Sequence, residues 1–359
     1  MKFKIFYMIV FVIFAMQSTA QNYTYSNRII KSFSVQKNAT LDVYNKYGKI
    51  HFITWEKDSV NITIDYLLTA SKQEKIEKMK QSVRFDFVPS KYFVSAKTQI
   101  GNKSDDIVQN INDMVTIFGS SIQIDYTIRI PADINLKIEN KFGDIYIDDV
   151  AGNVSLKLSN GDLKANKLTG NANDLDLSFG NSSITNIDNA RITAIYEDVY
   201  IKSTNKISFN TKSSKITIDD VEDVKSISKR DKYYIGNMNS MSGNSTFSDF
   251  TIRNLNDEML FDFKYGNVHV DNISKKFSMI KTTSKYTDFR LYFDKTSSFD
   301  VDIAQTSGSL NFSKDVFDLK QNTVVETKKT YSVGKVGSLN TNAKLSMTAE
   351  LGNIDLIAK

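Results

Sequence analysis

The chain has 359 residues but no cysteine, only two prolines and only two histidines. Without cysteine it can form no disulfide, thiolate nucleophile, cysteine-ligated zinc site or iron–sulfur cluster. The two histidines, His51 and His269, leave little room for a histidine metal site or a Ser-His-Asp triad. We therefore expect a protein that has no catalytic residues, no metal and no other cofactor.

A large excess of one charge is lacking as well. The chain has 46 basic and 41 acidic residues, mixed along its length, and a formal net charge of +5. Proteins that bind nucleic acids gather lysine and arginine on one face, so we expect no nucleic acid partner. The hydrophobic fraction of 41% is that of an ordinary folded protein.

A long apolar run occurs only at the start of the chain. Lys2 and Lys4 precede an unbroken apolar stretch at residues 5–16, and Ser18–Ala20 supply small residues for cleavage. This pattern predicts a secretory signal peptide over residues 1–20 and a mature chain that begins near Gln21. The stretch is too short to span a bilayer of ~30 Å, so we expect no transmembrane segment after the leader is removed. The sequence indicates an exported protein of the periplasm, the outer cell surface or the medium.

A short corner motif recurs along the chain after Pro131. Each copy has a first residue that is often aromatic, a small or polar corner, and an apolar-x-apolar alternation. Between Phe142 and Tyr265, successive copies start 17 to 19 residues apart, and beyond Tyr265 they start 20 to 24 residues apart. An isolated copy, YGKIHF, begins at Tyr47. The copies are FGDIYI (Phe142), NGDLKA (Asn160), FGNSSI (Phe179), YEDVYI (Tyr196), SSKITI (Ser213), RDKYYI (Arg230), FSDFTI (Phe247), YGNVHV (Tyr265), YTDFRL (Tyr286), SGSLNF (Ser307), YSVGKV (Tyr331) and LGNIDL (Leu351).

Each repeat unit is predicted to contain two short strands, because its apolar residues alternate and Asn and Gly mark its turns. An antiparallel meander would also alternate strands and turns, but it has no reason to repeat one corner chemistry at a constant step. We therefore expect an all-β protein whose residues 132–359 form a β-solenoid, similar to a parallel β-helix, of about twelve coils spaced ~4.8 Å apart. The predicted interior includes Ile145, Leu163, Val199, Ile216 and Val268.

Two details of the motif bear on this prediction. FGNSSI fits poorly, because Ser182 stands where the other units have an apolar residue. Four corner glycines are predicted to be required by a positive φ or by close approach of the next coil. They are Gly143, Gly161, Gly180 and Gly266.

Residues 21–131 lack the regular repeat and are predicted to form an N-terminal cap. One amphipathic helix is expected at Ser71–Ser82, where Ile76, Met79 and Val83 share a face. Residues 101–120 are either a second helix or an insertion. Strands are expected at Thr40–Val43, Val60–Leu68, Val83–Val88 and Ser121–Ile130.

Two longer segments, NKYGKIHFITW at Asn45–Trp55 and NKFGDIYI at Asn140–Ile147, carry a family resemblance. Together with the leader and the serial aromatic-glycine corners, they resemble the bacterial putative-adhesin family of secreted β-solenoid proteins of unknown function. The resemblance covers nearly the whole mature chain. It implies an exported, non-catalytic cell-envelope scaffold or adhesin-like binding protein, and it offers no catalytic residues. Ser213, Arg230 and Ser307 depart from the pattern at the aromatic position.

The alternative function is a polysaccharide-active enzyme, a lyase or hydrolase, on a parallel β-helix. Such chemistry needs clustered carboxylates, and the chain has adjacent pairs at Asp105-Asp106, Asp148-Asp149 and Asp219-Asp220. Aspartate is common in turns for conformational reasons, and the DxDxDG calcium loop is absent. We interpret the pairs as turn residues.

One outward position in each motif strand would form a straight row in a solenoid. Aromatic rings stack on sugars, so this row favours an extended glycan or another envelope polymer as partner. The alternative is that Tyr and Thr stand there only because they suit strands. The row contains His51, Tyr146, Lys164, Ser183, Tyr200, Thr217, Tyr234, Thr251, His269 and Arg290, of which Tyr146, Lys164, Tyr200, Tyr234, His269 and Arg290 are the candidate binding residues.

Overall fold

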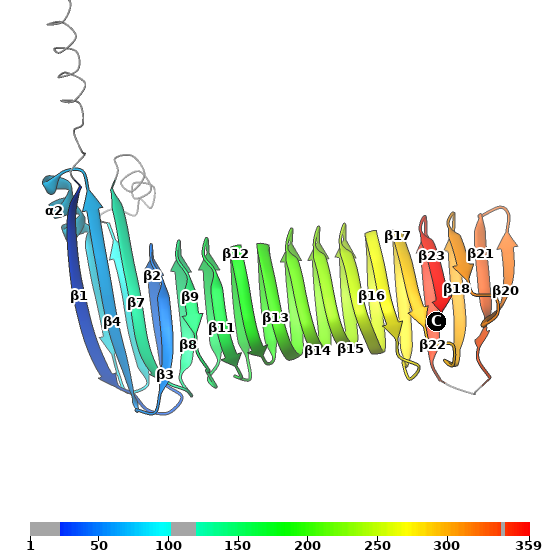
Figure 1. Ribbon diagram of the computed structural model, residues 1–359, viewed down its shortest axis with the longest axis horizontal. Helices are drawn as coiled ribbons and strands as arrows, with labels where there is room; N and C mark the ends of the chain where they lie inside the picture. Colours follow the sequence, from blue (N-terminus) through cyan, green and yellow to red (C-terminus); the bar gives the residue numbers. More distant parts are fainter. Residues whose placement is uncertain (1–21, 102–119, 339–341) are drawn as a thin grey trace, which may run out of the picture.

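The computed structural model describes residues 22–101, 120–338 and 342–359. Most of them belong to one 23-stranded, mostly parallel sheet, and the described part contains a single helix, α2 (Gln73–Ser82). The strands lie side by side along the longest axis and give an elongated molecule (Figure 1). The chain is all-β, as predicted. The expected signal peptide and residues 102–119 lie outside the described residues.

The strands before the regular repeat belong to the N-terminal end, and the strands after Asn135 carry the repeat. Strands β12, β13, β16 and β17 each continue through a corner of the motif, at Phe179, Tyr196, Tyr265 and Tyr286. The strands are β1 (Tyr23–Ser34), β2 (Thr40–Lys46), β3 (Ile50–Trp55), β4 (Ser59–Ala70), β5 (Val83–Pro89), β6 (Phe93–Ile100), β7 (Ser121–Pro131), β8 (Asn135–Lys141), β9 (Ile145–Ile147), β10 (Val154–Ser159), β11 (Leu163–Leu168), β12 (Asn173–Ile187), β13 (Ala190–Lys212), β14 (Lys215–Lys229), β15 (Lys232–Thr246), β16 (Asp249–Ile273), β17 (Met279–Phe293), β18 (Phe299–Thr306), β19 (Ser309–Phe312), β20 (Phe317–Val324), β21 (Lys329–Val336), β22 (Lys344–Glu350) and β23 (Asn353–Ala358).

The repeat units pair with one another in parallel and in register. Ile145 is opposite Leu163, and the same position continues through Ser182 and Val199 to Ile216. The alternation of the motif therefore places one set of side chains inside in every unit. The predicted interior residues are at most 2% exposed, namely Ile145, Leu163, Val199, Ile216 and Val268.

The corners of the units have a repeated backbone conformation. The first residue of twelve motif copies is not glycine yet has φ between 52° and 65°. The following glycine is required for a different reason, which is close approach. A Cβ added to Gly143 would lie 2.1 Å from the carbonyl oxygen of Gly48, and one added to Gly266 would lie 2.0 Å from that of Ser248. The close-approach prediction is confirmed, and the positive φ belongs to the preceding residue.

Polar side chains inside the corners bond backbone groups that the bend leaves without partners. Buried Asn140 donates from Nδ2 to the carbonyl oxygens of Gly48 and Gly143 at 2.9 and 2.8 Å. In units without a corner glycine, the corner residue itself takes this role. The Asp231 carboxylate accepts the N–H of Ser214 at 2.8 Å. This is why polar residues are tolerated in the interior.

The isolated motif copy at Tyr47 belongs to the same ladder of units. Strand β2 pairs in parallel with β8, β3 pairs with β9, and the ring of Tyr47 stacks on that of Phe142 at 5.4 Å. The ladder thus runs across residue 131. Beyond it, β1 and β5 add antiparallel strands, and α2 lies at this end (Figure 1). The predicted strands and helix of this region are confirmed.

The C-terminal unit is placed out of sequence order. Strands β22 and β23 pair with β17 on one side and with β18 and β19 on the other. Figure 1 shows these red strands between yellow β17 and orange β18. The interpretation of YSVGKV as a repeat corner is wrong, because Tyr331 lies in β21, which is antiparallel to β18 and β20. That hairpin forms the C-terminal end of the sheet.

Candidate binding surface

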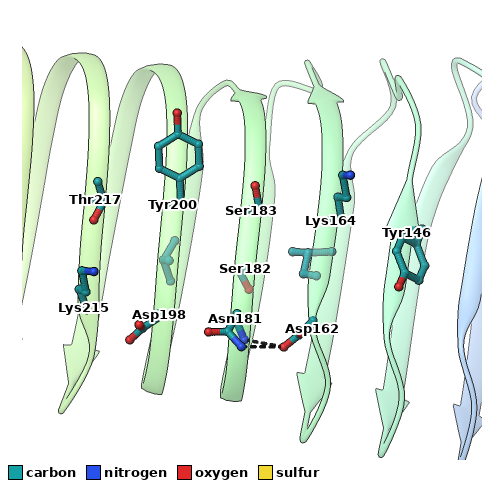
Figure 2. Close-up of a pocket in the computed structure, with 12 residues that line it drawn as sticks. Tyr146, Asp162, Lys164, Asn181, Ser182, Ser183, Asp198, Tyr200, Lys215 and Thr217 are labelled. Atoms are coloured by element: carbon teal, nitrogen blue, oxygen red, sulfur yellow. Dashed lines mark hydrogen bonds between the residues drawn. The ribbon is translucent and has the colours of Figure 1, made fainter.

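The ten outward residues predicted to form a row occupy the same position of their motif strands, and Thr251 and His269 are both in β16. Strand pairing connects His51 to Tyr146 and continues unit by unit to Thr251, and His269 pairs with Arg290. None of the ten is buried. Figure 2 shows Tyr146, Lys164, Ser183 and Tyr200 on successive strands of one face. We call these ten residues the outward row.

Two of the three tyrosines of the outward row, Tyr146 and Tyr200, donate hydrogen bonds to neighbouring carboxylates. The Tyr146 hydroxyl donates to Asp144 at 3.3 Å, and that of Tyr200 donates to Asp219 at 2.6 Å. The hydrogen bond to Asp219 raises the pKa of Tyr200 above its ordinary value. Tyr200 and Tyr234 remain 38% and 41% exposed, so their rings are available to a ligand.

The basic residues of the outward row differ in whether they are paired with a carboxylate. Arg290 forms an ion pair with Asp355 at 3.5 Å, because the C-terminal unit is inserted beside β17. His269 bonds Asp271 through Nε2 at 2.7 Å. Lys164 is exposed and has no ion pair with a described residue. Free positive charge on the row therefore centres on Lys164.

A shallow groove of about 400 Å³ crosses the row. Its sides are formed by Tyr146 and Lys164 in one direction and by Tyr200 in the other, with the small Ser183 between them (Figure 2). A second line of polar residues borders it, where Asn181 donates to Asp162 at 3.1 Å. The groove is open along the face, which suits a chain better than a compact molecule.

A buried carboxyl group lies beneath this groove. Ser182, which fits the apolar pattern poorly, is buried and donates to Oε1 of Glu197 at 2.7 Å. Glu197 is only 2% exposed, and its Oε2 has no hydrogen-bond partner among the described residues. Burial raises the pKa of Glu197 to about 7, although the bonds from Ser182 and the Gly180 backbone oppose the shift. In the sequence, Glu197 stands at a corner position where the other units have a small or polar residue. The sequence does not show that the Glu197 side chain points into the interior.

The first residues of the corners form a second exposed row that the sequence analysis did not single out. The rings of Phe179 and Tyr196 stack at 5.3 Å, and Phe247 stacks on Tyr265 at 4.6 Å with only 9° between the ring planes. Tyr265 in turn stacks on Tyr286 at 5.0 Å. The stacks follow from a shared backbone conformation at a repeat of ~4.8 Å.

The acidic pairs considered as catalytic candidates are bonded within the ladder. Asp149 accepts a hydrogen bond from Asn166, and Asp220 accepts one from Asn237 at 2.6 Å. Asp105 and Asp106 lie outside the described residues. Within the ranges that the structure describes, no group of three potential metal ligands occurs. No helix in those ranges is long and apolar enough to cross a membrane.

Solved structures similar to this chain come from bacterial proteins described as adhesins. A putative cell adhesion protein from Clostridium sporogenes is 13% identical with a TM-score of 0.21, and the match covers 93% of this chain and 100% of that one. A putative adhesin from Parabacteroides distasonis is 11% identical with a TM-score of 0.33, covering 74% and 97%. One from Bacteroides fragilis is 11% identical with a TM-score of 0.27, covering 92% and 97%. No protein-family model matches the chain, and no curated protein matches it significantly.

Proposed function

We propose that the protein is an exported, non-enzymatic β-solenoid that acts as an adhesin-like binding protein or envelope scaffold. Parallel pairing of equivalent positions supports the solenoid, and twelve corners with positive φ support a count of about twelve coils. The leader pattern at residues 1–20 supports export to the periplasm, the cell surface or the medium.

The proposed ligand is an extended polysaccharide bound along the outward row. The observation that carries this proposal is the in-register row of exposed rings and polar tips, which is interrupted by an open groove. Sugar rings stack on Tyr200 and Tyr234, and the groove at Ser183 accepts the chain between two aromatic side chains. Many weak contacts along a straight face add up without a deep pocket.

The test replaces three rings of the row while keeping strand propensity. The variant Tyr200→Thr, Tyr234→Thr, His269→Thr should bind the preferred member of a polysaccharide panel at least about fivefold more weakly, because contacts at several units are lost together. The matched control replaces exposed rings elsewhere, Tyr23→Thr, Tyr92→Thr and Tyr331→Thr, and should bind like the wild type.

Both triple variants should keep the thermal midpoint of the wild type within a few degrees. Unchanged binding by the folded row variant would refute the row as the contact surface. The same incubations also test the enzymatic alternative, since release of reducing ends or unsaturated products would contradict a purely binding function.

A further inference from the structure

Two neighbouring units carry a cluster of positive charge at their corners. The corners begin at Ser213 and Arg230, and register pairing places Lys212 opposite Lys229 and Lys215 opposite Lys232. All the cations of this cluster are exposed. The cluster, which we call the basic corner, consists of Lys212, Lys215, Lys229, Arg230 and Lys232.

The charges of the basic corner are not neutralised by ion pairs with described residues. The ion pairs of the neighbouring units involve other side chains, such as Lys206 with Asp223. The Lys215 Nζ atom lies over the ring of Tyr234, 5.8 Å from its centroid. Like charges opposite each other in a sheet, ~4.8 Å apart, are destabilising. A bound anion would remove that repulsion.

Four acidic residues lie near the basic corner, Asp198, Asp231, Asp249 and the buried Glu197, and they leave its five cations in excess. Asp198 and Asp249 flank it in register, and Asp249 already accepts two hydrogen bonds from Asn267. Asp231 is buried beneath it and bonds Thr211 at 2.6 Å. Asp231 also accepts bonds from Ser228, from the Ser214 N–H and from the Lys229 N–H.

Aromatic stacks end on both sides of the basic corner. The stack of Phe179 and Tyr196 ends one unit before Ser213, and the stack that begins with Phe247 starts one unit after Arg230. The two intervening units have no ring at this position. The basic corner therefore places positive charge between two aromatic stacks of the second exposed row.

We propose that the basic corner binds an acidic polysaccharide, with the lysines and Arg230 holding its anionic groups and the adjoining rings contacting its sugars. A linear acidic polysaccharide repeats its charged group at about the length of one sugar, which is close to the spacing of the units. A single-stranded nucleic acid would need several free ring faces for stacking, and here most faces are occupied by neighbouring rings. The basic corner borders the outward row, since Lys215 also lines the groove and lies near the ring of Tyr234. None of its five cations belongs to the row, so the proposal goes beyond the one above.

The test uses the full mature protein with four defined probes: polygalacturonate, dextran sulfate, neutral dextran and single-stranded DNA. The site variant is Lys212→Gln, Lys229→Gln, Arg230→Gln. The control variant is Lys157→Gln, Lys202→Gln, Lys225→Gln, which removes the same charge from exposed lysines outside the basic corner. The site variant should bind the better of the two acidic polysaccharides at least about tenfold more weakly, or ~1.4 kcal/mol. The control should change it less than about twofold, and binding should weaken as salt is added.

Folding is checked by the thermal midpoint without polymer, which should stay equal or rise in the site variant because like charges are removed. A lower midpoint would mean that the cations serve to compensate buried Asp231, and would overturn the proposal. Equal weakening in both variants, failure of the wild type to bind either acidic polysaccharide, or tighter binding of the DNA than of both would also overturn it. Because the site variant keeps Tyr200, Tyr234 and His269, its result is independent of the outward-row test.

Discussion

Glu197 shows how the folded interior changes the chemistry of one side chain. Its carboxyl group is 2% exposed and has a pKa raised to about 7 by burial. A carboxyl group with a raised pKa holds its proton more tightly in the folded protein than in the unfolded chain. Its favourable contribution is therefore fully present below the unfolded pKa and is lost as the pH rises to about 7.

We expect the Glu197→Gln variant to be more stable than the wild type above pH 7 and about equally stable near pH 4. Gln stays neutral, and its Oε1 can still accept the hydrogen bond from Ser182. The difference at high pH should be on the order of 3 kcal/mol, from 1.36 kcal/mol for each pKa unit. Urea midpoints at pH 4 to 8 measure it, with the exposed Glu222→Gln as control. If the urea midpoints of the wild type and of the Glu197→Gln variant changed equally with pH, this would contradict the raised pKa of Glu197.

At the residue scale, the clustering of positive charge in the basic corner could not be predicted from the composition. Lys212 and Lys229 are separated along the chain by a whole repeat unit but become direct neighbours in the sheet. Charges that look evenly mixed along the sequence therefore gather at one place in three dimensions. Glu197 is similar, because its corner motif does not show whether the side chain points in or out.

At the scale of the element, the alternating pattern predicted the strands and the interior because burial alternates with every residue in a strand. The order of the units could not be predicted. Each unit presents the same backbone edge, so a parallel ladder accepts any unit with a matching alternation. The unit that contains Leu351 fills a position between those of Tyr286 and Ser307, and this also provides Asp355 as the partner of Arg290.

The inserted position of the C-terminal unit can be tested with engineered disulfides, since the chain has no cysteine of its own. Arg290→Cys and Asp355→Cys occupy opposed positions of adjacent strands, ~4.8 Å apart, which lies within the Cα separation that a disulfide requires. This pair should oxidise readily, as seen by a mobility shift that reductant reverses. The control pair Arg290→Cys and Asn311→Cys is two strands apart and should not. Cross-linking of the control pair alone would place the units in sequence order.

At the scale of the whole molecule, the parallel register places the same position of successive motif copies side by side. A residue type that recurs in the motif therefore forms a continuous surface. The ladder is bounded by antiparallel strands at both ends, β1 and β5 at one and the β20–β21 hairpin at the other. Between these ends, the strands follow one another along the long axis (Figure 1). Equivalent side chains repeat at a constant step, so the outward row and the second exposed row of corner residues extend in the same direction. A surface of this form favours ligands that are themselves periodic.

The dependence of affinity on ligand length tests the central claim most directly. From Tyr146 to Arg290 the outward row crosses nine units, a distance on the order of 40 Å. Size-fractionated fragments of the polysaccharide that binds the wild type would be titrated calorimetrically. We predict that the affinity per chain rises with each added sugar until the fragment spans this distance and then levels off. A di- or trisaccharide that binds as tightly as the full polymer would contradict the account, because it would show a compact site in place of an extended row.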